Sequence, residues 1–128
     1  MKTNPIVWFE IYVQDMARAR GFYESVLQIQ LESMQAPEGE AAGFEMLAFP
    51  NSMEATGAGG MLVKMPGGPS GGGGTLIYFA SEDCAVEQAR AVAAGGKVFK
   101  PTFAIGPYGF CALLTDTEGN CIGVHSMK

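Results

Sequence analysis

Hydrophobic and polar residues alternate at the start of the chain and then change to a helical spacing. From position 7 to position 13 every second residue is apolar, which predicts a half-buried strand. The other face of that strand would carry Trp8, Glu10 and Tyr12. Asp15 is a good N-cap, because its carboxylate can accept hydrogen bonds from the first free amides of a helix. Apolar residues recur at helical spacing from there to Leu27, so we expect a strand that runs directly into an amphipathic helix.

The rest of the first half reads as short strands separated by turns. Strands are expected at 29–34, 44–49 and 61–65, with polar turns at 35–42 and 51–60. The glycine-rich stretch 67–74 that follows has the composition of a flexible linker.

Beyond that stretch the opening pattern returns. Asp83 lies 68 positions after Asp15, follows a similar apolar run, and again stands before a helical pattern, which ends at Gly95 and Gly96. Strands are then expected at 97–100, 110–115 and 121–127, with a loop reaching Gly109 and a tight turn DTEGN. The chain therefore reads as two β-α-β-β-β copies: module 1 at about 5–66, a linker at 67–74, and module 2 at about 75–127. Each copy, at about 60 residues, is small for an independent domain, so the two are expected to share one core.

Composition indicates one globular domain. The chain has 128 residues, of which 48% are apolar, enough to build a core. No run approaches the roughly 20 apolar residues of a membrane span, and the first ten residues contain a proline and an acid where a signal peptide would be apolar. We therefore expect a cytoplasmic protein with no membrane partner.

Charge and cysteine content exclude further classes. The net charge is −5 with only eight Lys and Arg in total, which argues against a nucleic-acid partner. The three cysteines, at 84, 111 and 121, show no zinc-ligand spacing and cannot all pair. We expect them to be reduced and mostly buried.

The repeat and two motifs together resemble the glyoxalase, bleomycin resistance and extradiol dioxygenase superfamily, whose members are also called vicinal oxygen chelate proteins. The motifs are a strand followed by D-x-x-R-A-x-x-F-Y, beginning at Asp15, and the turn D-x-x-G-N, beginning at Asp116. The resemblance covers nearly the whole chain and implies an α+β fold in which two βαβββ modules form a barrel-like cavity. It does not specify a reaction, because the superfamily includes isomerases, lyases such as those acting on lactoylglutathione, dioxygenases, and antibiotic-binding proteins.

Many metal-using members of that superfamily hold a divalent ion with His, Glu or Gln from the first and last strands of each module. Carried over residue by residue, those positions fall here on Trp8, Met61, Leu76 and Gly123. None of the four is a nitrogen or oxygen donor of the kind that such ions require. We therefore expect no metal and no other cofactor. A relocated site would need a third donor, such as Glu45 or Glu54, beside Glu10 and His125.

The resemblance would also bring Glu10 and His125 close together as the general acid/base pair of the cavity. The alternative is that Glu10 lies at an exposed rim or holds a backbone amide, and that His125 has a structural role. Candidate ligand-binding residues are Trp8, Tyr12, Tyr78, Met61, Phe110 and Tyr108, although such residues are more often part of a core. The segment Thr102–Gly109 would be either a lid over the cavity or an ordinary connection between strands.

Three functions remain open from the sequence. The first is binding of a small apolar or aromatic metabolite without metal, with any chemistry carried by Glu10 and His125. The second is a metal-dependent lyase or dioxygenase with relocated ligands, and the third is a non-catalytic drug-binding protein. A homodimer is expected in each case, because such folds often expose sheet edges that a partner covers.

Overall fold

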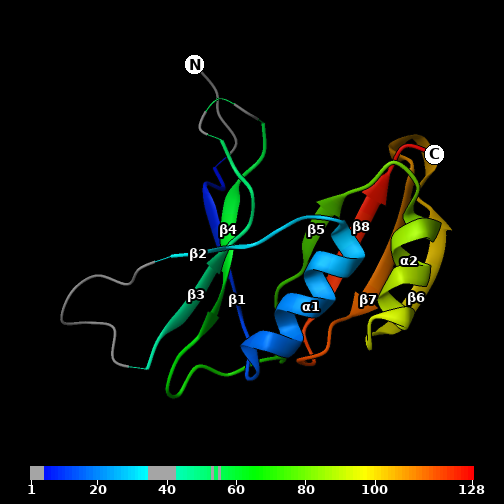
Figure 1. Cartoon of the computed structure of the whole chain (residues 1–128). Coiled ribbons are helices and arrows are strands. Elements are labelled where there is room, and N and C mark those ends of the chain that lie inside the picture. The colour runs from blue at the N-terminus through cyan, green and yellow to red at the C-terminus, as the bar shows by residue number, and fades with distance from the viewer. Residues whose placement is uncertain (1–4, 35–42, 53, 55) are drawn as a thin grey trace.

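The computed structural model describes residues 5–34, 43–52, 54 and 56–128 (Figure 1). The turn expected at 35–42 lies outside the described residues, as do two positions of the turn expected at 51–60. The first half of the chain contains β1 (Trp8–Tyr12), α1 (Met16–Leu27), β2 (Glu32–Ser33), β3 (Glu45–Ala48) and β4 (Gly59–Lys64). The second half contains β5 (Ile77–Ala80), α2 (Cys84–Ala93), β6 (Lys97–Ala104), the 3-10 helix η1 (Gly106–Tyr108), β7 (Phe110–Thr115) and β8 (Cys121–Ser126).

The two halves have the same topology. The described strands form two four-stranded sheets with the orders β1-β4-β3-β2 and β5-β8-β7-β6. In each sheet the first strand pairs in parallel with the last, and the other pairs are antiparallel. This arrangement confirms the predicted α+β fold of two tandem βαβββ modules. The cavity between them is open, because the two sheets do not close into one barrel.

Both helices begin where the sequence predicts. The Asp15 carboxylate accepts a hydrogen bond from the Arg18 amide at 3.0 Å, and the Asp83 carboxylate accepts one from the Ala85 amide at 3.1 Å. Each bond satisfies an amide that has no partner inside its helix. The second helix ends before Gly95, whose φ of 96° is a left-handed conformation that glycine adopts without strain.

Several strand boundaries differ from the prediction. β2 has only two residues, and β4 begins at Gly59 instead of position 61. β6 continues through Pro101 to Ala104, where the sequence suggested a loop. This is possible because β6 is an edge strand with irregular pairing, and a proline at an edge removes no bond from the sheet interior.

An aromatic cluster joins the two halves into one core. The ring of Phe79, from β5, lies 6.0 Å from Phe9, 5.5 Å from Phe49 and 6.1 Å from Tyr23, all three of which come from the first half. α1 also packs beside α2, which lies along β6, β7 and β8 (Figure 1). The buried residues of both halves form a single cluster, so each module completes the core of the other.

The glycine-rich segment 67–74 is attached to both modules. The Ser70 hydroxyl donates to the Tyr12 carbonyl at 2.7 Å, and the Gln14 amide group donates to the Gly68 carbonyl at 2.8 Å. The Gly71 amide donates to the Asn120 side chain at 2.6 Å. The composition predicted a flexible linker, but in the structure these bonds fix the middle of the segment.

Candidate functional site

The candidate site lies where the edge strands of the two sheets meet. β1 and β5 belong to different sheets and run in opposite directions (Figure 1), and the Phe9 and Phe79 rings that they carry lie 6.0 Å apart. Between them opens a cavity of about 890 Å³, here called the seam cavity, and a smaller one of about 380 Å³ continues along the same two strands. The two cavities share Glu10, Thr75 and Ile77 in their linings.

The seam cavity is mainly apolar and aromatic. Trp8 and Tyr78 line it with side chains that are 39% and 49% exposed, and Phe9, Phe49 and Phe79 extend the apolar lining toward the core. Its volume is within the range of cavities that bind small organic molecules. Of the predicted ligand-binding residues, the structure brings Trp8 and Tyr78 together here.

The four positions that correspond to metal ligands do not fit a divalent ion. Trp8 and Leu76 line the seam cavity without a donor atom of the required kind. At Gly123, a Cβ atom would come within 2.5 Å of the Tyr78 ring, so this ring occupies the space of a ligand side chain. Met61 pairs with Glu10 across β1 and β4 and offers only a thioether. Within the described ranges, no three His, Cys, Asp or Glu residues gather as a metal site would require.

Glu10 and Tyr12 form a pair at the middle of the seam. The Tyr12 hydroxyl donates to the Glu10 carboxylate at 2.8 Å, and Tyr12 lines the smaller cavity. This hydrogen bond, together with burial, raises the pKa of Tyr12. The phenol therefore remains protonated at neutral pH and continues to donate to Glu10.

His125 lies elsewhere. Its Nε2 atom lies 2.6 Å from the Tyr108 carbonyl and donates to it, and the ring lines a third cavity of about 520 Å³ together with Tyr78, Phe103 and Cys111. Glu10 lines the two seam cavities instead. The structure thus does not unite Glu10 and His125 into the acid/base pair that the resemblance suggested.

The third donors considered for a relocated metal site are also separated from Glu10. Glu45 forms an ion pair with Lys64 at 3.6 Å. Lys64 lies three residues after Met61 on β4, so the pair Glu45 and Lys64 lies on the opposite face of the sheet from Met61 and Glu10. Glu54 is exposed in the connection between β3 and β4.

The remaining predicted residues have other surroundings. Phe110 packs against the hydrophobic core, and Tyr108 is 70% exposed on η1. Thr102 belongs to β6, where its amide and hydroxyl donate to the Gln88 side chain at 2.7 and 2.8 Å. These bonds favour an ordinary strand connection over a lid at the segment Thr102–Gly109.

The three cysteines are free thiols, and Cys84 and Cys111 are buried, as the sequence predicts. Burial raises the pKa of Cys111 and of Cys121, which keeps both thiols protonated. Cys84 contacts the Ser126 hydroxyl at 3.1 Å in the core.

Sequence reasoning missed Glu87, which reaches the seam cavity from α2. Only the tertiary arrangement places it there, at the end of β5, where Glu87 accepts a hydrogen bond from the Ser81 hydroxyl. The contribution of Phe9 and Phe79 to the cavity lining could have been predicted from the sequence, because the two residues occupy nearly equivalent positions in the repeat.

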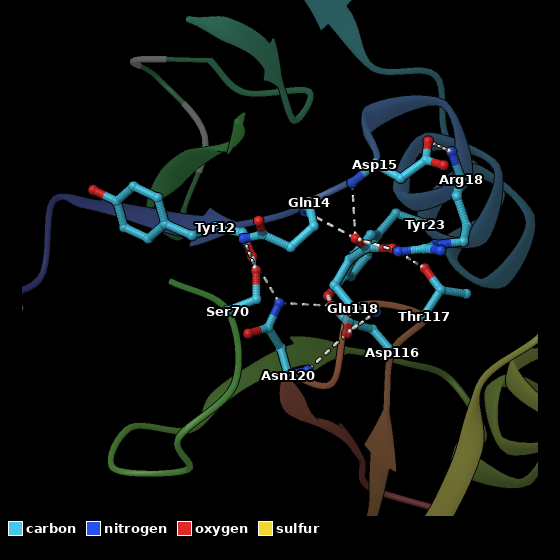
Figure 2. Close-up of polar contacts among 10 residues, drawn as sticks. All are labelled: Tyr12, Gln14, Asp15, Arg18, Tyr23, Ser70, Asp116, Thr117, Glu118 and Asn120. Atoms are coloured by element: carbon cyan, nitrogen blue, oxygen red, sulfur yellow. Dashed lines mark hydrogen bonds and ion pairs between the residues drawn. The ribbon is translucent and has the colours of Figure 1, made fainter. Parts of the chain in front are cut away.

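A polar cluster lies at the C-terminal end of β1, where the chain enters α1, and it joins the two modules (Figure 2). The Glu118 side chain is fully buried and accepts hydrogen bonds from the Gln14 and Asp15 amides at 2.9 and 3.0 Å. The Arg18 guanidinium binds the same carboxylate through two nitrogens at 2.7 and 2.9 Å. Glu118 therefore holds the junction between β1 and α1 from the other module.

The pKa of Glu118 reflects the number of hydrogen bonds that its carboxylate accepts. Burial would raise it, but the bonds from Arg18, the two amides and Thr117 outweigh burial and place the pKa at about 2. Beside it, Asp116 accepts from the Tyr23 hydroxyl at 2.6 Å, and burial next to that carboxylate raises the pKa of Tyr23 well above its usual value. The turn motif that begins at Asp116 is thus mainly part of the fold, and only its last residue, Asn120, lines the smaller cavity.

Two tandem βαβββ modules with a cavity between their first strands define the class of vicinal oxygen chelate folds. The family model described as the Glyoxalase/Bleomycin resistance protein/Dioxygenase superfamily matches residues 5–124. The chain belongs to this superfamily.

Relatives and solved structures agree with this membership. CFP32 of Mycobacterium tuberculosis, whose name assigns it provisionally to the glyoxylases, is 30% identical over 123 residues, which are 96% of this chain and 44% of that protein. The counterpart in Mycobacterium bovis matches equally. The chain thus spans less than half the length of these curated relatives.

Among solved structures, glyoxalase I from Zea mays superposes with a TM-score of 0.73 at 16% identity, over 96% of this chain and 46% of that one. A glyoxylase/bleomycin resistance protein/dioxygenase domain from Frankia superposes with a TM-score of 0.69 at 15% identity, over 99% and 100%. At these identities the similarity shows the fold. Within the described residues, no helix has the length and apolar character needed to cross a membrane.

Proposed function

We propose that this protein binds a small apolar or aromatic metabolite in the seam cavity, and that it does so without the divalent metal that many of its relatives use. The observation that carries this proposal is the lining of the cavity. Aromatic side chains stand where the superfamily has metal ligands: Trp8 replaces one, and the ring of Tyr78 covers another at Gly123. Removing apolar surface of a ligand from water would provide most of the binding energy.

Any chemistry in this cavity would depend on Glu10, the carboxylate that faces both parts of it. Its partner Tyr12 holds one carboxylate oxygen and leaves the rest of the group available to a ligand. A carboxylate in that position can accept a proton from a bound molecule, whereas His125 faces the neighbouring cavity.

The proposal can be tested by fluorescence, because Trp8 is the only tryptophan of the chain. Excitation at the red edge of tryptophan absorption avoids signal from a phenyl compound, so 4-phenylbutanol is a suitable neutral probe. We expect a saturable change in Trp8 emission with a Kd of about 1 mM or tighter, as is usual for a compound of this size. Tyr78→Ala should weaken binding several-fold, and Tyr108→Ala, which changes an exposed tyrosine outside the cavity lining, should leave it unchanged. Absence of saturation, or equal losses in the two variants, would contradict the proposal.

The same titration tests the metal-free part of the proposal. After dialysis against a chelator, we expect the binding curve to stay the same, and elemental analysis of the untreated protein to find no stoichiometric Zn, Ni, Mn or Fe. A curve that requires one of these ions would instead favour the metal-dependent lyase or dioxygenase.

The homodimer expected from the sequence stays a prediction. Sedimentation velocity at micromolar concentration would test it, with twice the chain mass as the expected result. Ligand-linked dissociation would show that the cavity and the subunit contact are coupled.

A further inference from the structure

The charged groups of the seam cavity all have the same sign. Glu10 and Glu87 are the charged residues in its lining, and its smaller continuation adds none. Among the described residues, no Lys, Arg or His lines either part. The whole chain is also acidic, with a net charge of −5. An anionic ligand would therefore be repelled, both at long range and inside the cavity.

The two carboxylates differ in how far their charge is neutralised. Glu87 accepts a hydrogen bond from the Ser81 hydroxyl and has the Arg90 guanidinium at 3.8 Å. Glu10 accepts one from the neutral Tyr12 hydroxyl, and no ion pair involves it among the described residues. Glu10 is thus the cavity carboxylate with no cation beside it among the described residues.

Aromatic surface lies close to that charge. Trp8 stands two residues before Glu10 on the same face of β1. Tyr78 lies against Gly123 on one side and is 49% exposed. The electron-rich faces of such rings attract cations, in addition to their affinity for apolar groups.

We propose that the ligand of the seam cavity is a small organic amine in its protonated form, with an aromatic or aliphatic body. The ammonium group lies at Glu10, near the rings of Trp8 and Tyr78, and the body fills the apolar part of the cavity beside Phe49 and Phe79. This inference rests on the proposed function, because it specifies which metabolites the same cavity accepts.

The test compares three probes that share one body and differ in charge: 4-phenylbutylamine, 4-phenylbutanol and 4-phenylbutanoate. Trp8 emission reports binding of each at pH 7 and fixed ionic strength. We expect the amine to bind about tenfold more tightly than the alcohol, because it adds a charge-assisted hydrogen bond. The carboxylate should bind more weakly than the alcohol.

Variants assign the preference to Glu10. Glu10→Gln should abolish the tenfold advantage of the amine over the alcohol. Glu32→Gln is the matched control, because it removes the same charge from an exposed strand residue outside the cavity lining, and it should keep the advantage. Thermal unfolding of each variant establishes that it is folded. As a second variant, Ala80→Lys places a cation in the cavity lining and should shift the preference toward the carboxylate.

The outcomes separate the two proposals. Equal affinity for all three probes would overturn the amine preference and leave binding in the cavity supported. If Glu10→Gln and Glu32→Gln lose the preference for the amine equally, this preference comes from the net charge of the protein. That result would overturn the proposal that Glu10 binds the ammonium group. If no probe changes Trp8 emission in a saturable way, both the proposed function and this inference are wrong.

Discussion

Glu10 lies in the middle of β1 and Glu118 contacts the residues that follow this strand, and the surroundings of the two glutamates differ in almost every respect. The Glu118 side chain is fully buried and accepts bonds from Arg18, two backbone amides and Thr117. Glu10 is exposed to the seam cavity and accepts one bond, from Tyr12. The first carboxylate has its acceptor capacity filled by the protein, and the second has most of it free.

This difference separates structural from functional acids in one molecule. Glu118 belongs to the second module but binds the amides that precede α1 in the first, so its charge contributes to the association of the modules. Glu10 contributes little to that association and remains available to a ligand. The predictions below test this distinction through stability.

The largest effect is expected for Glu118→Ala. The substitution leaves the part-buried amides of Gln14 and Asp15 without their acceptor and the Arg18 guanidinium without its partner. We expect a loss of about 3–4 kcal/mol in the free energy of unfolding, measured by urea denaturation. The matched control is Glu10→Ala, for which we expect a change within about 0.5 kcal/mol. Similar losses in both variants would show that the two acids do not differ in role.

A smaller loss in the free energy of unfolding is expected when the pH is lowered. The folded pKa of Glu118 is about 2, below its ordinary value of 4.5. Its contribution to stability is therefore complete above pH 4.5 and is lost as the pH falls from 4.5 toward 2. The shift corresponds to at most about 3 kcal/mol, and because Arg18 is half exposed to solvent, we expect about 2 kcal/mol. Urea denaturation at several pH values would show this dependence, and Glu118→Gln should reduce it. An unchanged slope in Glu118→Gln would mean that other acids cause the loss.

The fold was predictable because local signals agree with one another. The capping residues Asp15 and Asp83, the period-two strands and the repeat all indicate βαβββ modules, and each is confirmed by the structure. The edges of β2 and β6 were not predictable, because edge strands tolerate irregular pairing that leaves little trace in the sequence. The bonds of Ser70 to the first module were hidden by the glycine-rich composition around it.

The candidate site was predictable only in part. Trp8, Glu10 and Tyr78 follow from strand position, because alternation and the repeat place them on the cavity side. The separation of Glu10 and His125 depends on the distance between β1 and β8, which lie in different sheets. Glu118 shows the same limit, since its partner Arg18 is 100 residues away in the sequence. Which side chains of one module contact those of the other is decided by how the modules pack, and a local sequence pattern does not contain this information.

The smallest effect that should still be measurable is that of Tyr23→Phe. The substitution removes the hydroxyl that donates to Asp116 at 2.6 Å and keeps the ring that packs between Phe49 and Phe79. Asp116 keeps donors from the Glu118 and Asn120 amides and from the Asn120 side chain. We therefore expect a loss of about 1–1.5 kcal/mol in the free energy of unfolding. Tyr108→Phe is the control, because that tyrosine is largely exposed, and it should have no effect.

Combining Tyr23→Phe with Glu118→Ala tests whether the polar cluster acts as one unit. Asp116 contacts both residues, through the Tyr23 hydroxyl and through the Glu118 amide. Residues that share a partner usually show non-additive losses, so the double variant should lose less than the sum of the single variants by at least about 0.5 kcal/mol. Strict additivity would mean that Tyr23 and Glu118 stabilise the junction independently. The same cycle with Glu10→Ala in place of Glu118→Ala should be additive, because the Glu10 carboxylate is bonded to the Tyr12 hydroxyl and not to Asp116, the partner that Tyr23 and Glu118 share.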